Sequence, residues 1–109
     1  MSAKISKKII LKSIIRRIVS VLPPEEIILF GSYVKGKLKS ESDIDIAVIY
    51  NNPHSKRQIA MDIYMALAGL GVPIDIIILA TQEVKKYENA KETIIHEIIK
   101  NGRTIFKSH

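Results

Sequence analysis

The sequence contains no cysteine and no tryptophan, and only 6% of its 109 residues are aromatic. The absence of cysteine excludes disulfide bonds, thiolate metal sites and a cysteine nucleophile, so any metal ion would need oxygen or histidine ligands. No apolar run reaches the roughly 20 residues that cross a bilayer. The segment from Met1 to Ile10 also lacks the apolar stretch and cleavage site of a signal peptide, so we expect a cytoplasmic protein that does not contact membranes.

The remaining composition is that of a folded protein. Hydrophobic residues make up 47% of the chain and charged residues 26%, a balance typical of globular proteins. A chain of this length fits one domain, so we expect residues 1–109 to form a single small domain. The net charge of +6 suits anionic partners, which include ATP as well as nucleic acids.

Apolar spacing and turn residues predict alternating helices and strands. Leu11 to Leu22 has helical spacing and stops at Pro23-Pro24, where proline removes a backbone donor. Ile27 to Phe30 and Ile44 to Tyr50 are typical of buried strands. A second helix follows, with a buried side expected at Ile59, Ile63, Ala66, Leu67 and Leu70 and closure at Gly69 and Gly71.

The last part of the chain continues this alternation. Pro73 to Leu79 is β-branched almost throughout and predicts a strand buried on both faces. Thr81 with Glu83 is suited to capping a short helical turn, and a final helix carries Ile94 to Ile99. Arg103 to Lys107 is compatible with an edge strand. The order α-β-β-α-β-α, with that final strand, predicts a small α/β or α+β domain with a mixed central sheet flanked by helices.

Three of the four aspartates fall on segments that otherwise look like buried strands. Residues two apart on a strand project to the same face, with Cα atoms about 7 Å apart, so Asp43 and Asp45 present paired carboxylates. An unpaired aspartate inside an isoleucine strand costs several kcal/mol, so Asp75 needs a partner such as a cation. If the strand of Asp75 lies beside that of Asp45, the three carboxylates offer hard oxygen ligands suited to Mg²⁺ or Mn²⁺.

Gly31 and Ser32 stand where a strand gives way to a turn. Backbone N–H groups and a hydroxyl can converge on an anion at such a place, and glycine permits close approach of the backbone. A lone Gly-Ser is usually only a turn, and Asp-x-Asp is usually surface chemistry. The two motifs together, in this order along the chain, are a more specific signal of function than either motif alone.

The string GSYVKGKLKSESDIDIAV, with ten residues between Gly31-Ser32 and Asp43-Ile44-Asp45, resembles the signature of the minimal nucleotidyltransferases in the DNA polymerase beta-like superfamily. The resemblance extends to Asp75 on a later strand. It implies nucleotide binding by Gly31, Ser32, Lys35 and Gly36. Relatives often carry arginine at the place of Lys35, and lysine keeps the charge but not the bidentate phosphate geometry.

The resemblance also implies a mechanism with ATP as substrate. All three aspartates would hold one Mg²⁺ ion beside the attacking hydroxyl, and Asp43 and Asp45 would hold a second on the triphosphate, with Mn²⁺ as a substitute. We expect Lys37 and Lys39 to be either solvated or close to the phosphates. His54 and His96 are expected to be structural.

The acceptor is the least constrained part of the function. Stand-alone minimal nucleotidyltransferases are typically paired with a small all-α HEPN toxin, so the resemblance implies a hetero-oligomer in which AMP is transferred to a tyrosine of that partner, as an antitoxin activity. One alternative is a non-catalytic subunit that neutralises or assists a helical partner by contact. A basic nucleic-acid-binding module is less well supported, because no aromatic stacking platform accompanies the charge.

Overall fold

A computed structural model of the chain describes residues 7–31 and 43–108. Its elements follow the expected order and add the final strand. They are α1 (Lys7–Val21), β1 (Glu26–Phe30), β2 (Ile44–Tyr50), α2 (Lys56–Leu67), β3 (Ile74–Ala80), α3 (Thr81–Tyr87), α4 (Ile94–Asn101) and β4 (Arg103–Lys107). The predicted α+β class is therefore confirmed. None of the helices within the described ranges combines the length and apolar character needed to span a membrane.

The four strands form one mixed sheet in the order β3-β2-β1-β4. Strand β1 pairs antiparallel with both β2 and β4, whereas β2 and β3 run parallel because α2 makes the crossover between them. The segment 103–107 is thus the edge strand that was expected. The opposite edge is formed by β3, which was expected to be buried on both faces and is buried over only part of its length.

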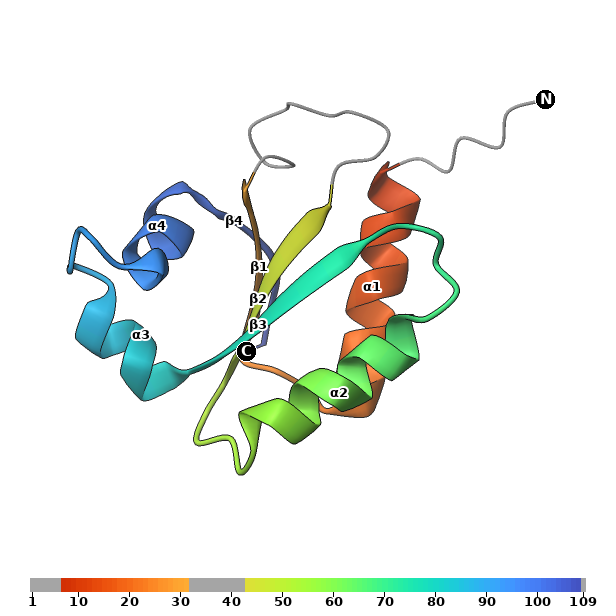
Figure 1. Ribbon diagram of the computed structural model, residues 1–109, viewed down its shortest axis with the longest axis horizontal. Coiled ribbons are helices and arrows are strands. Elements are labelled where there is room, and N and C mark those ends of the chain that lie inside the picture. The colour runs from red at the N-terminus through yellow and green to blue at the C-terminus, as the bar shows by residue number, and fades with distance from the viewer. Residues whose placement is uncertain (1–6, 32–42, 109) are drawn as a thin grey trace.

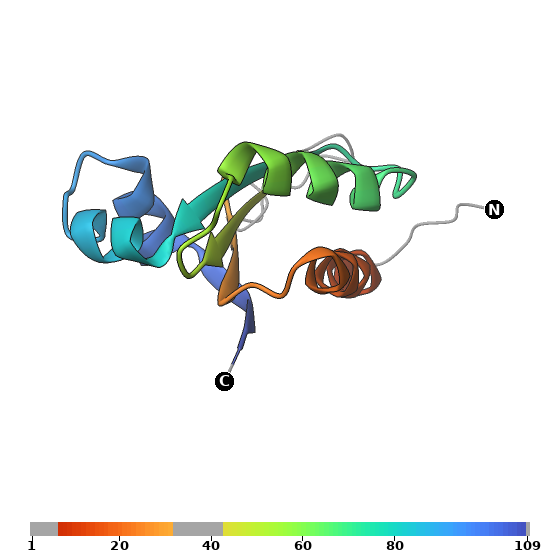
Figure 2. The ribbon, with the colours of Figure 1, turned by 90° about the horizontal axis from the view of Figure 1, so that it is seen from below.

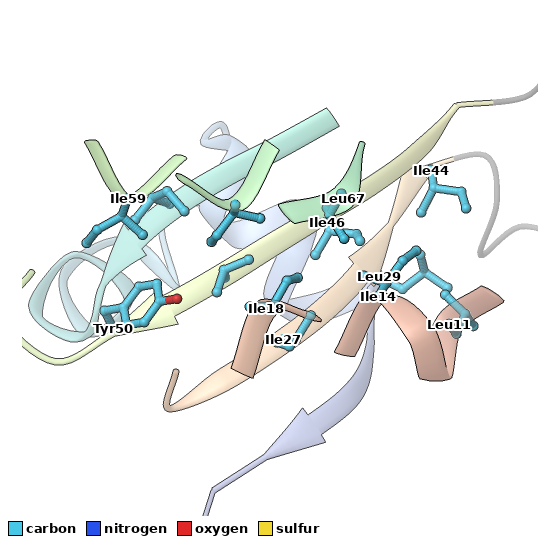
Figure 3. Close-up of a cluster of buried hydrophobic side chains, with 13 residues drawn as sticks. Leu11, Ile14, Ile18, Ile27, Leu29, Ile44, Ile46, Tyr50, Ile59 and Leu67 are labelled. Atoms are coloured by element: carbon cyan, nitrogen blue, oxygen red, sulfur yellow. The ribbon is translucent and has the colours of Figure 1, made fainter. Parts of the chain in front are cut away.

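Helices cover both faces of the sheet (Figure 1). Helices α1 and α2 lie on one side and α3 and α4 on the other, and the view from below shows the same two layers (Figure 2). The alternation of side chains along β2 explains this arrangement, because Ile46 and Val48 pack under α1 and α2 while Ala47 and Ile49 pack under α4. Figure 3 shows the larger of the two apolar clusters, to which α1, α2, β1, β2 and, through Ile78, β3 contribute.

Two local predictions were wrong at element ends. Helix α2 ends at Leu67 with Ala68 as its C-cap, so Leu70 packs against the core from the following loop rather than from the helix. Of the two residues expected to cap α3, Glu83 does so and Thr81 does not. The Glu83 side chain accepts a hydrogen bond from the N–H of Ala80 at 2.8 Å, while the Thr81 hydroxyl donates to the carbonyl of Tyr50 in β2.

His96 has the structural role that was expected of it. Its Nδ1 lies 2.8 Å from the carbonyl oxygen of Glu88, and its backbone N–H donates to the hydroxyl of Thr93, the N-cap of α4. These contacts hold the start of α4 against the end of α3. His54 is exposed.

Arg17 joins α1 to the C-terminus of α2. Its Nη1 donates to the carbonyl oxygens of Ala66 at 3.1 Å and Ala68 at 3.2 Å, where a cation also complements the helix dipole. Arg17→Met should therefore lower the free energy of unfolding by about 1 to 2 kcal/mol, the usual worth of such bonds. Urea unfolding of Arg17→Met would measure this loss, with Arg16→Met, a change at an exposed neighbouring residue, as the control. Equal stability of the two variants would contradict the capping role.

Candidate active site

The carboxylate pair stands at the start of β2. Ile44 is 1% exposed and points into the core under α1 and α2, so strand alternation turns Asp45 toward the opposite face. Asp43 is exposed and Asp45 is partly buried. That the two side chains share a face stays a prediction, because Asp43 lies just before the strand.

Asp75 lies on the neighbouring strand in direct register with Asp45. The N–H of Ile44 donates to the carbonyl of Pro73 at 2.9 Å, and this bond starts the parallel ladder that sets the two strands side by side. Adjacent strands lie about 4.8 Å apart, so the backbones that carry Asp45 and Asp75 are neighbours. The condition set for bringing the three carboxylates together, that these two strands are adjacent, is therefore met.

The expectation that Asp75 is buried and needs a partner was wrong. Asp75 is exposed, and no charged or polar side chain among the described residues is buried. Strand β3 is an edge strand, and the apolar cluster under α4 includes Leu79 near its far end. Because water reaches Asp75, its charge does not need a partner to be tolerated. The assignment of Asp75 to the site therefore depends on its position beside Asp45.

Gly31 lies against the carboxylate of Asp45. Phe30 is the register partner of Asp45 at the end of β1, and Gly31 follows with a φ of +78°. A Cβ added to Gly31 would lie 3.2 Å from Cγ of Asp45 and closer still to its Oδ2. Glycine is required here for two reasons, since the left-handed conformation disfavours side chains and the Asp45 carboxylate occupies the space of a Cβ.

The electrostatics of Asp45 reflect this crowding. Burial raises the pKa of Asp45 above its ordinary value, and the negative charges of Asp75 and Asp43 raise it further. The charges of Asp43 and Asp75 therefore both act on Asp45, and three such carboxylates are a donor set suited to a hard divalent cation. However, no three acidic or histidine side chains in the described ranges gather closely enough to form a ready-made metal site. The backbones are in place for such a site, but the side chains do not converge.

The raised pKa predicts how stability responds to pH when metal is absent. The folded chain holds the proton of Asp45 more tightly than the unfolded chain, so ionised Asp45 opposes folding once the pH exceeds the raised value. Asp45→Asn should be more stable than the native chain at pH 7 in EDTA, by no more than about 1 kcal/mol because water screens a partly exposed charge. This advantage should shrink as the pH falls through the raised pKa toward 3.8. Thermal unfolding across this pH range would measure it, and a less stable variant at pH 7 would contradict it.

The remaining residues of the predicted phosphate loop lie outside the described residues. Ser32, Lys35 and Gly36 fall in the range 32–42, as do Lys37 and Lys39. Their assignment to nucleotide binding stays a prediction. Gly31 and the three aspartates are the predicted site residues that the structure brings to one end of the sheet.

A hollow of about 410 Å³ opens near this end of the sheet, between the end of α2 and the start of β3. Its lining runs from Leu67 to Ile74, the residue before Asp75, and includes Tyr64 on α2. No motif in the sequence marks Tyr64 as a site residue. The helical spacing of the buried residues Ile59, Ile63 and Leu67 leaves it on an outer side of α2, and it is 43% exposed.

Comparison with known proteins gives a family match and similar solved structures. The family model described as polymerase beta, nucleotidyltransferase, matches residues 12–109. Among solved structures, a candidate nucleotidyltransferase from Sulfolobus solfataricus is similar with a TM-score of 0.62 and 20% identity, covering 97% of this chain and 93% of that one. A toxin–antitoxin structure with AMP-PNP has a TM-score of 0.57 and 21% identity, covering 91% and 74%. No curated protein matches the chain.

Proposed function

The chain belongs to the polymerase beta nucleotidyltransferase family, and from this premise we propose that it transfers AMP from ATP to a hydroxyl group of an acceptor, as one domain spanning residues 1–109. The observation that carries the proposal is the arrangement at one end of the sheet. Asp45 stands in register with Asp75, and its carboxylate lies against Gly31, the first residue of the expected phosphate loop. The family match supports the reaction class.

We assign the metal ligands of the reaction to Asp43, Asp45 and Asp75. Bound there, Mg²⁺ or Mn²⁺ would neutralise charge on the triphosphate and favour ionisation of the attacking hydroxyl. The acceptance of a cation is consistent with the raised pKa of Asp45, since a cation relieves the repulsion among the three carboxylates. The side chains of the exposed Asp43 and Asp75 are free to turn toward an ion.

The protein contributes positioning and charge to the transfer. The acceptor oxygen forms a bond to the α-phosphorus, the bond from that phosphorus to the bridging oxygen breaks, and pyrophosphate leaves. The proton of the acceptor passes to the Asp75 carboxylate and then to water. Gly31 and Ser32 bind the β- and γ-phosphates through backbone N–H groups and the Ser32 hydroxyl. Lys35 and the neighbouring Gly36 assist this binding.

The acceptor in this proposal is a tyrosine of a small all-α HEPN protein with which the chain forms a hetero-oligomer. The match to a toxin–antitoxin structure with AMP-PNP supports both an adenosine nucleotide and a protein partner. An antitoxin activity follows if the added AMP inactivates the partner. The reaction would take place in the cytoplasm, where ATP and Mg²⁺ are available.

Labelled ATP tests the proposal directly. The purified chain is incubated with Mg²⁺ and a candidate all-α HEPN partner, in parallel with ATP labelled at the α-phosphate and at the γ-phosphate. Label should reach the partner from the α position only, because the γ-phosphate leaves with pyrophosphate. Label transferred from the γ position would indicate a kinase reaction and contradict the proposal.

A second candidate is a subunit that acts on its partner by contact alone. It is favoured by one observation, the lack of three converging acidic or histidine side chains within the described ranges. This model predicts no transfer of label, together with tight binding of the partner that survives the combined change Asp43→Asn and Asp45→Asn. Loss of transfer with binding retained in that variant would instead identify a catalytic role for the aspartates.

A further inference from the structure

Strand β3 forms an open edge of the sheet, and one of its outward N–H groups is satisfied by a side chain. Odd-numbered backbone groups of this segment face β2, as the bond from the Ile44 N–H to the Pro73 carbonyl illustrates. The N–H of Ile76 therefore points away from the sheet. It donates to the phenol oxygen of Tyr64 at 2.9 Å. A helix side chain thus takes the place of a missing strand.

A second side chain closes the far end of the same edge. Glu83 accepts from the N–H of Ala80 at 2.8 Å and also pairs with Lys56, the first residue of α2. The hydrogen bond from Lys56 lowers the pKa of Glu83, and the bond from Ala80 adds to this effect. Helix α2 is therefore attached to the edge of β3 at both ends. The attachment through Tyr64 is the one nearer Asp45 and Asp75.

The Tyr64 bond falls one residue after Asp75. On the inner side, the ladder with β2 holds the backbone of Asp75. On the outer side, the hydroxyl of Tyr64 provides the hydrogen bond at Ile76. The segment that leads into this point passes Gly69 and Gly71, both with positive φ and with open space around them. The start of β3 would therefore have less support on its outer side without Tyr64.

We propose that Tyr64 is a positioning residue for nucleotide transfer, which fixes the start of β3 and thereby sets the place of the Asp75 carboxylate. This inference rests on the proposed function, because it concerns the work of Asp75 in that reaction. The phenol oxygen accepts a hydrogen bond in this arrangement, so phenylalanine at the same position would fill the same space and lose only the bond. The role is specific to the hydroxyl and not to the ring.

The test compares Tyr64→Phe with Tyr87→Phe, which removes the same hydroxyl from an exposed tyrosine on α3. Tyr64→Phe should lower kcat for AMP transfer about 10-fold, in the range found for groups that orient metal ligands, and leave the KM for ATP within about twofold. The Ile76 amide should exchange with solvent faster in this variant. Tyr87→Phe should change none of these quantities.

The outcomes separate this inference from the function on which it rests. If the native chain transfers AMP and both variants match it, Tyr64 has no positioning role and the inference is wrong, while the proposed function stands. If KM rises with kcat unchanged, the residue acts in binding and the inference is also wrong. If the native chain transfers nothing, the proposed turnover fails. The positioning role of Tyr64 is then tested by measuring the binding of Mn²⁺, in the presence of ATP, by electron paramagnetic resonance. Weaker Mn²⁺ binding in Tyr64→Phe than in Tyr87→Phe supports positioning, and equal binding or none overturns it.

Discussion

Asp45→Asn should reduce the transfer of AMP at least about 10²- to 10³-fold, the usual cost of losing a group that stabilises charge in the transition state. Asparagine keeps the size of the side chain and removes its charge, so the fold should survive while a cation loses its central ligand. Asp45 is the carboxylate that adjoins both Asp75 and Gly31, which makes it the most sensitive of the three. The initial rate of label transfer from ATP would measure the effect.

The chain offers a matched control in its fourth aspartate. Asp62 is exposed on α2, where it accepts a hydrogen bond from Gln58 at 2.9 Å, and it has no place in the site. Asp62→Asn should keep most of the activity. If Asp45→Asn retains more than about a tenth of the native rate, the smaller effects typical of residues that only orient a ligand would describe Asp45 better.

Gly31→Ala should damage both stability and activity. Alanine at a φ of +78° costs about 1 kcal/mol from backbone strain alone. The new Cβ also collides with the Asp45 carboxylate, so either that side chain or the strand end must move. We expect a total loss of about 2 to 3 kcal/mol, in line with overpacked sites. For a domain of this size that loss corresponds to a fall in Tm of roughly 8 to 20 °C. Transfer should fall with it, because the displaced carboxylate is the proposed metal ligand.

Gly69→Ala separates the two causes. Gly69 has a φ of +88°, but a Cβ there would meet nothing within 4 Å. This variant should show only the backbone cost, near 1 kcal/mol. Thermal unfolding and label transfer measured on both variants would distinguish backbone strain from the collision with Asp45. Equal losses in the two would mean that the contact between Gly31 and Asp45 has no energetic weight.

Local patterns in the sequence were sufficient to predict most of the elements and the pairing of Asp43 with Asp45. Strand period alone predicts these two carboxylates on one face, and it is a property of neighbouring residues. The position of Asp75 beside Asp45 could be expected only on the condition that their strands are adjacent. The crossover through α2 meets that condition.

The exposure of Asp75 could not be predicted in the same way. A run of isoleucines is equally consistent with a central strand and with an edge strand that is covered over part of its length. Which of these β3 becomes depends on β4, a segment that pairs with β1 and so leaves β3 at the other edge. The contact of Gly31 with Asp45 likewise depends on the register of β1 against β2, and the bond from Ile76 to Tyr64 depends on how α2 packs. Each of these is set by residues that lie far apart in the sequence.

The pairing of β4 with β1 has a consequence for how the chain folds as it is made. The Thr104 hydroxyl donates to Glu26, 78 residues earlier, so the β1 edge cannot be covered until nearly all of the described chain has left the ribosome. Strands β1 to β3 and helix α2 are available sooner and pair over shorter separations. During that interval the nascent domain has one edge closed by Tyr64 and Glu83 and the other open along Ile27 and Ile28. The open edge is where a newly made chain is most exposed to pairing with another.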